Sequence, residues 1–127
     1  MNKPPDQVLI CCSGGGLAAG SAIALVAKIP GVSVHSVEPV GFDDTARSLS
    51  GGERVRIDDK ARSICDALQV PTPGEMTFAI NRELLGTGLV VSDAEVCEAM
   101  RFAFRHLKLV VEPGGAAALA AASCRQR

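Results

Sequence analysis

The segment Ser13-Gly-Gly-Gly-Leu17 has the composition of a loop that binds a small anion. It lies between a short apolar run, residues 8–12, and an apolar stretch, residues 16–28, that predicts a buried helix. Glycines at such a turn permit positive φ and a close approach of a ligand to the backbone. The unpaired N–H groups and the dipole at a helix N-terminus favour negative charge. We therefore predict a phosphate ligand, bound by backbone N–H groups and by the Ser13 hydroxyl.

Two other interpretations of this turn stay open on the residues alone. The glycines could serve only a tight connection between a strand and a closely packed helix. Alternatively, Glu38 at the end of the next expected strand could bind a ribose, as in a Rossmann-type dinucleotide-binding domain. The match to G-x-G-x-x-G is weak, because Ala19 stands at the third glycine position. The loop also contains no lysine, so the G-x-x-x-x-G-K spacing of nucleotide triphosphatases is not met.

Three carboxylates, those of Glu38, Asp43 and Asp44, fall within seven residues just after an expected strand. Oxygen ligands of this kind bind Mg²⁺ or Ca²⁺, with a main-chain carbonyl as an extra ligand. The two aspartates could equally cap a short helix over residues 45–49. The cluster therefore predicts either a cation site or a helix start.

Glu112 is the third candidate for a functional residue. It ends the apolar stretch 109–112 and precedes Pro113-Gly-Gly115 and an alanine-rich helix. Its carboxylate could line a pocket at the carboxyl edge of a sheet, or it could cap the helix that follows. The residues alone leave both possibilities open.

The elements that must position these residues alternate between strands and helices. Residues 8–12 and 33–37 are expected strands, and the intervening helix completes a right-handed βαβ unit. Thr72-Pro-Gly-Glu75 and Ser92-Asp-Ala-Glu95 each predict a helix start with a capping box. A third strand, residues 88–91, is expected between these two helices. The pattern predicts an α/β fold with three α/β/α layers and a mainly parallel sheet.

Composition restricts the classes of function. A chain of 127 residues, 47% hydrophobic and 21% charged, indicates a single globular domain over residues 1–127. A net charge of −1 without a basic patch, and the lack of Trp and Tyr, argue against a nucleic-acid partner. No apolar stretch approaches the ~20 residues that span a bilayer, and residues 1–7 have no signal-peptide pattern. We therefore expect no membrane partner and a cytoplasmic location.

Six motifs, taken in order, resemble the fold-type II pyridoxal-phosphate enzymes, specifically the serine/threonine dehydratase (ammonia-lyase) and serine racemase group. The motifs are S-G-G-G-L-A-A-G from Ser13, V-E-P-V-G-F-D-D-T-A-R-S-L from Val37, S-I-C-D-A-L from Ser63, P-T-P-G-E-M-T-F from Pro71, V-S-D-A-E from Val91 and K-L-V-V-E-P-G-G-A from Lys108. They extend over nearly the whole chain. Six ordered motifs are far more specific than one glycine turn, so the resemblance disfavours the dinucleotide interpretation.

The resemblance implies a role for each matching position. The fold would be part of a tryptophan-synthase-β-like large domain, with Glu112 near the ring of pyridoxal 5'-phosphate. Asp66 and Ala67 match an Asp-Gly pair that faces the ring, and alanine in place of glycine restricts a close backbone approach. The residues implied to bind the cofactor phosphate are Ser13, Gly14, Gly15, Gly16 and Leu17. The divalent-cation site of metal-activated relatives, for Mg²⁺ or Ca²⁺, would comprise Glu38, the carbonyl of Phe42, and Asp44.

The resemblance also identifies what this sequence lacks. The family's chemistry requires a lysine that forms a Schiff base with the cofactor aldehyde. None of the four lysines stands in the expected serine-x-lysine setting, and the serine-glycine-glycine-asparagine segment that meets the ring nitrogen is absent. We therefore expect residues 1–127 to be the C-terminal part of the cofactor-binding large domain, without the Schiff-base lysine region.

The implied parent enzyme removes water and then ammonia from a β-hydroxy amino acid, leaving a 2-oxo acid. Its partners would be the small amino-acid substrate and further copies of itself in a homo-oligomer. We expect this chain alone to be inactive. The alternative from another functional class is a non-catalytic binding or interaction module of the same fold.

Overall fold

A sheet of three parallel strands forms the centre of the molecule, which a computed structural model describes over residues 3–124. The strands are β1 (Gln7–Cys11), β2 (Ser33–Pro39) and β3 (Leu89–Val91), in the order β1-β2-β3. Both strand pairs are parallel. All three strands therefore end at the same edge of the sheet, and the residues that follow them lie at that edge.

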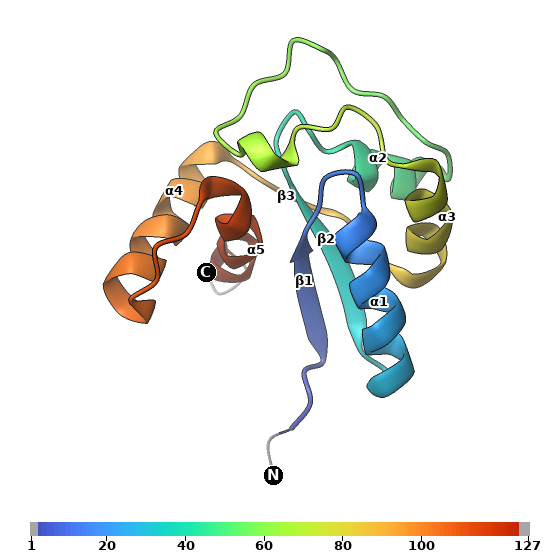
Figure 1. Cartoon of the computed structure of the whole chain (residues 1–127), viewed down its shortest axis with the longest axis horizontal. Helices are drawn as coiled ribbons and strands as arrows, with labels where there is room; N and C mark the ends of the chain where they lie inside the picture. Colours follow the sequence, from blue (N-terminus) through green and yellow to red (C-terminus); the bar gives the residue numbers. More distant parts are fainter. Residues whose placement is uncertain (1–2, 125–127) are drawn as a thin grey trace.

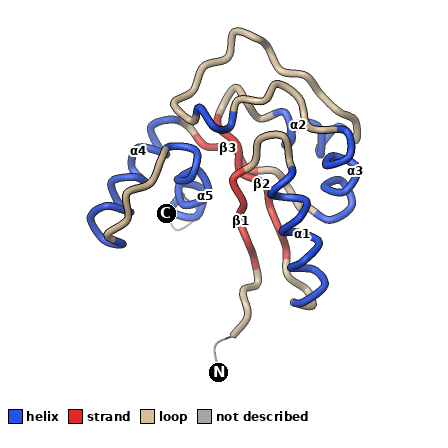
Figure 2. Tube along the Cα trace, viewed as in Figure 1, coloured by secondary structure: helices blue, strands red, loops and turns tan. Residues whose placement is uncertain are grey.

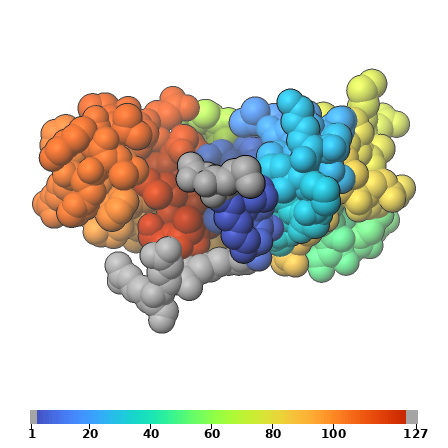
Figure 3. All heavy atoms as spheres, turned by 90° about the horizontal axis from the view of Figure 1, so that it is seen from below, coloured from blue at the N-terminus to red at the C-terminus, as the bar shows by residue number. Residues whose placement is uncertain are grey.

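Helices cover both faces of this sheet (Figures 1 and 2). On one side lie α1 (Gly16–Lys28), α2 (Asp44–Gly51) and α3 (Glu75–Leu84), with α3 packed on α1. On the other side α5 (Pro113–Cys124) packs on the strands and α4 (Asp93–Phe102) packs on α5. Viewed from the amino ends of the strands, β1 lies between α5 and α1 (Figure 3). The three α/β/α layers and the parallel sheet predicted from the sequence are confirmed.

Two shorter helical segments complete the described chain. A 3₁₀ turn, η1 (Asp66–Leu68), follows a long irregular segment, and a π-helical segment, η2 (Ala103–Leu107), continues α4. The π segment ends at Lys108, whose φ of 59° lies in the left-handed region. Within residues 3–124, no helix combines the length and the apolar character needed to cross a bilayer.

The alternation of side chains along β2 divides the core into two parts. Val34 packs with α1 on one face, and Val37 packs with α5 on the other; both are fully buried. The buried face of α5 consists of alanines, none more than 5% exposed: Ala116, Ala117, Ala120 and Ala121. These small side chains allow α5 to lie close to the strands.

The two predicted capping boxes have different outcomes. At α4 the box is present, because Ser92 Oγ accepts from the Glu95 N–H at 3.3 Å and Glu95 Oε2 accepts from the Ser92 N–H at 2.7 Å. At α3 the predicted box is wrong, since the N-cap is Gly74 and no side chain caps the helix. Thr77, in the first turn of α3, instead donates its hydroxyl hydrogen to the carbonyl of Gly14 in the glycine loop.

Candidate functional site

The glycine loop, residues 13–17, begins one residue after β1 and runs into the first turn of α1 at the carboxyl edge of the sheet (Figure 1). It lines a cavity of about 290 Å³. The other walls come from η1 and from the start of α5, two segments far from the loop in sequence. Their lining residues are Ala67, Leu68, Glu112, Gly114 and Gly115. The structure thus brings together the predicted phosphate-binding loop and the predicted ring-side residue Glu112.

The N–H groups of the glycine loop have no acceptor in the part of the chain that the structure describes. Among the hydrogen bonds of these residues, none uses the N–H of any residue from 13 to 17 as donor. Gly16 and Leu17 open α1, where the first N–H groups have no carbonyl one turn earlier to bind. A row of unpaired N–H groups at a helix N-terminus is a binding site for an anion. The chemistry of this donor set fits a phosphate group.

The carbonyls of the same loop bind α3 on the side away from this row. The Gly14 carbonyl accepts from Gly74 N at 3.1 Å and from Thr77 Oγ1 at 2.6 Å. The Gly15 carbonyl accepts from Asn81 Nδ2 at 3.2 Å. Neither Thr77 nor Asn81 could be identified from the sequence, since nothing in the local spacing of α3 links them to a loop more than sixty residues earlier.

Gly15 is required at its position for two separate reasons. Its φ of 91° lies in the left-handed region, which is unfavourable for any residue that has a Cβ atom. A Cβ atom there would lie 2.8 Å from Asn81 Nδ2 and 3.0 Å from Thr77 Oγ1. The loop therefore depends on glycine here both for conformation and for close packing on α3.

Ser13 keeps a hydroxyl that can serve a ligand. Its Oγ accepts a hydrogen bond from the Val70 N–H at 3.4 Å. The hydroxyl hydrogen is not used in this bond and can be donated to a ligand. Ser13 also lines the cavity. Its position is therefore compatible with the predicted role beside the phosphate.

The backbone of Glu112 takes part in the first turn of α5, and its carboxylate is available to bind a ligand. Its carbonyl accepts from the Ala116 N–H at 3.1 Å, at the start of α5. Its carboxylate is exposed, lines the cavity and forms no hydrogen bond among the described residues. Of the two possibilities left open by the sequence, the structure thus places this side chain in the cavity wall and not on the N–H groups of α5.

Ala67 lines the same cavity as the glycine loop. A Cβ atom built on Gly114 would lie 3.3 Å from the Ala67 Cβ, so the turn η1 and the start of α5 are in close contact. The neighbouring Asp66 is exposed and does not line the cavity. The methyl group of Ala67 therefore occupies space in the wall that a glycine would leave open.

Glu38 proves to be the cap of α2. Its side chain is fully buried, and its Oε1 and Oε2 accept from the Thr45 and Ala46 N–H groups at 2.9 and 2.8 Å. Asp43 stands at the N-cap position of this helix, as predicted, but its side chain makes no capping hydrogen bond and instead pairs with Arg47 Nε at 2.9 Å. A carboxylate buried and bonded in this way cannot reach a ribose, which counts against the dinucleotide interpretation.

The structure gives observations for and against a cation at the expected ligands Glu38, Phe42 and Asp44. Both Glu38 oxygens already accept backbone N–H groups, and Phe42 is 8% exposed. Asp44 Oδ2 is buried without a hydrogen-bond partner and is the one observation that favours a cation here. Between residues 3 and 124, no group of three His, Cys, Asp or Glu side chains could hold a metal ion. The cation site stays a prediction.

Burial changes the acidity of this carboxylate pair. Removal from water raises the pKa of Glu38 from 4.5 to about 7, against the opposing effect of its two backbone hydrogen bonds. Burial likewise raises the pKa of Asp44 from 3.8 to about 6. The folded chain therefore holds protons on both groups at a pH where the unfolded chain has lost them.

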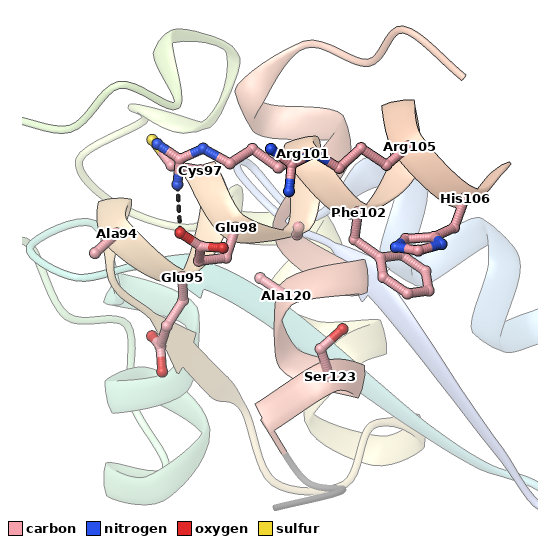
Figure 4. A pocket seen from close by; sticks show the side chains of 11 residues that line it. Ala94, Glu95, Cys97, Glu98, Arg101, Phe102, Arg105, His106, Ala120 and Ser123 are labelled. Carbon is pink, nitrogen blue, oxygen red and sulfur yellow. Dashed lines mark hydrogen bonds and ion pairs between the residues drawn. The ribbon is translucent and has the colours of Figure 1, made fainter. Parts of the chain in front are cut away.

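A second, larger cavity of about 820 Å³ lies on the outer face formed by α4, η2 and α5 (Figure 4). Glu98 and Arg101 form an ion pair there, and the rings of Phe102 and His106 are 4.9 Å apart. This cavity shares no lining residue with the glycine-loop cavity. It contains none of the candidate residues from the sequence analysis.

Comparison with known proteins gives a consistent result. The protein-family model described as pyridoxal-phosphate dependent enzyme matches residues 1–127. The chain is 42% identical over 118 residues to L-threo-3-hydroxyaspartate ammonia-lyase from Pseudomonas sp, covering 93% of this chain and 37% of the relative. It is 38% identical over 119 residues to serine racemase from Schizosaccharomyces pombe, covering 94% of this chain and 36% of the relative.

Solved structures show the same similarity. A threonine deaminase from T.th. superposes with a TM-score of 0.92 at 41% identity, over 96% of this chain and 44% of that one. Maize serine racemase gives a TM-score of 0.86 at 36% identity, over 92% of this chain and 35% of that one. The chain thus spans between about a third and under half of the length of these relatives.

Replacement of Gly15 by alanine tests the requirement for glycine. We expect Gly15→Ala to lower the free energy of unfolding by about 2 kcal/mol, because the alanine is strained at positive φ and its methyl meets Asn81. Urea denaturation followed by circular dichroism measures this change. The control is Gly20→Ala within α1, where a Cβ meets no atom within 4 Å and which should stabilise the helix. Equal effects of the two substitutions would contradict the prediction.

The buried carboxylates predict a pH dependence of stability. A pKa raised by folding means that the folded state binds more protons, so stability falls as the pH rises from about 4.5 to about 7. Asp44 adds to this fall between its ordinary 3.8 and about 6. Urea denaturation across this range, without divalent cations, should show the fall. Glu38→Gln should flatten it above pH 6, and an unchanged slope in that variant would refute the assignment to Glu38.

Proposed function

The chain belongs to the pyridoxal-phosphate-dependent enzyme family, and we propose that it is the phosphate-binding part of a threonine/serine dehydratase-like ammonia-lyase. The observation that carries this proposal is the row of unpaired N–H groups from residue 13 to residue 17 at the mouth of a cavity. A phosphate monoester bound there would gain several hydrogen bonds and the favourable field of α1.

The proposed substrate is a β-hydroxy amino acid, deaminated to a 2-oxo acid. Relatives similar over more than nine-tenths of this chain include an L-threo-3-hydroxyaspartate ammonia-lyase and a threonine deaminase. Serine racemases are similar to a comparable degree. Elimination is our proposal for the reaction, because the hydroxyaspartate ammonia-lyase and the threonine deaminase have the higher sequence identities among these relatives.

Different residues of the cavity would contact different parts of the cofactor. The glycine loop would bind the phosphate and fix one end of pyridoxal phosphate, while Ala67 and Glu112 form the walls beyond it. When bound, this cofactor supplies an electron sink for the carbons of an amino acid. The Glu112 carboxylate, exposed to the cavity, can accept a hydrogen bond from a group on the ring.

The chain alone is proposed to be inactive because the described residues that line the cavity include no nucleophilic amine. None of its described lining residues is a lysine. Lys3 pairs with Asp6, and Lys108 Nζ donates to the Arg105 carbonyl. Lys28 ends α1 and Lys60 is exposed in the irregular segment after α2. The amine that bonds covalently to the cofactor aldehyde would have to be supplied by residues outside this chain.

A non-catalytic interaction module is the second candidate. Several large apolar side chains lie on the surface, and Val110 is 90% exposed, Met76 78% and Phe104 65%. Such residues would suit contacts with other polypeptide segments or with further copies in a homo-oligomer. This candidate predicts a surface for protein contacts without affinity for phosphate.

Binding measurements distinguish these proposals. We expect the chain to bind pyridoxal phosphate in competition with inorganic phosphate, and to bind pyridoxal, which has no phosphate, at least about tenfold more weakly. Isothermal titration calorimetry measures each affinity. A chain with no affinity for pyridoxal phosphate or for inorganic phosphate would leave only the interaction module.

The same samples test the expected inactivity. L-serine, L-threonine or L-threo-3-hydroxyaspartate with pyridoxal phosphate should release ammonia no faster than the cofactor does without protein. Tritiated borohydride should leave no label on the protein, because no lysine is found among the described residues that line the cavity. Stable label on one of the four lysines, located by peptide mapping, would contradict this part of the proposal.

A further inference from the structure

The peptide groups of the glycine loop are oriented by two side chains of α3. In a planar trans peptide the C=O of one residue and the N–H of the next point in opposite directions. The carbonyls of Gly14 and Gly15 therefore determine where the N–H groups of Gly15 and Gly16 point. Both carbonyls accept hydrogen bonds from α3, and the Gly15 carbonyl also accepts from the Ala19 N–H of α1 at 2.9 Å, so the two N–H groups face away from α3.

Thr77 holds the first of these peptide groups. Its Oγ1 lies 2.6 Å from the Gly14 carbonyl, which is shorter than its 3.2 Å distance to the Gly74 carbonyl. The Gly74 N–H supports the same Gly14 oxygen at 3.1 Å. The shorter distance assigns the single hydroxyl hydrogen of Thr77 to the Gly14 carbonyl.

Asn81, one helical turn after Thr77, holds the second. Its Nδ2 donates to the Gly15 carbonyl at 3.2 Å, and its side chain is 1% exposed. The Oδ1 of the same amide is buried without a hydrogen-bond partner. Reversing the amide would set oxygen against oxygen at Gly15, so the acceptor fixes its orientation.

We propose that Thr77 and Asn81 are positioning residues for anion binding, which keep the carbonyls of the loop on α3 and its N–H groups toward the cavity. Without them, each carbonyl would keep a single backbone hydrogen bond, from Gly74 or from Ala19, and a glycine-rich turn has enough backbone freedom to rotate these peptide groups. After such a rotation, a carbonyl oxygen faces the anion at a position where an N–H group is needed to bind it. This inference rests on the proposed binding of a phosphate group by the loop.

Thr77→Val tests the inference, because valine keeps the shape of threonine and removes the hydroxyl. We expect the affinity for inorganic phosphate, measured by calorimetry on the folded chain, to fall by about tenfold, the effect of losing about one oriented hydrogen bond to an anion. Thr77→Ser, which restores the hydroxyl, should restore the affinity. Asn81→Leu should weaken phosphate binding in the same direction as Thr77→Val.

Ser92→Ala is the matched control for a general loss of stability. It removes the capping box of α4 at a residue that does not line the glycine-loop cavity, so it should lower the melting temperature and leave the phosphate affinity unchanged. If Thr77→Val binds phosphate as well as the unaltered chain does, the positioning role is refuted while the proposed function stands. If the unaltered chain binds no phosphate, the proposed function itself fails.

Discussion

The parallel register of three short strands is the constraint on which the candidate site depends. Because β1, β2 and β3 all run in the same direction, the glycine loop, Glu38 and Ser92 all lie at or near one edge of the sheet. A binding site at the carboxyl ends of parallel strands is a general property of open α/β folds. At this edge the N-terminus of α1 presents its unpaired N–H groups, and the start of α5 closes the cavity from the other layer.

Much of this arrangement could be predicted because its causes are local in sequence. Continuous apolar runs indicate strands buried on both faces, and the glycines between residue 13 and residue 17 indicate a strand-to-helix turn with unpaired N–H groups. The capping box at Ser92 is likewise a pattern of four residues. The residues alone left Glu112 as either a pocket wall or a helix cap, and the structure places its side chain in the cavity wall.

The remaining features depend on contacts between residues far apart in the chain. The hydrogen bonds from Thr77 and Asn81 to the loop join residues 63 and 66 positions apart, and no spacing within α3 indicates them. The local pattern suggests Glu38 as a ligand residue and the neighbouring aspartates as the cap. The cap of α2 instead comes from the strand before it, because folding places the end of β2 under the first turn of that helix.

The alanine face of α5 also limits how this sequence can change during evolution. Its buried positions are already filled by one methyl group each, and backbone and strands are too close for a longer side chain. Divergence at these positions is therefore restricted to residues of the size of glycine, alanine or serine. Most of the variation that the chain accumulates must fall on the outward faces of α1, α3 and α4, where side chains reach solvent. Substitutions on these outward faces can therefore accumulate without changing the packing of α5 on the sheet.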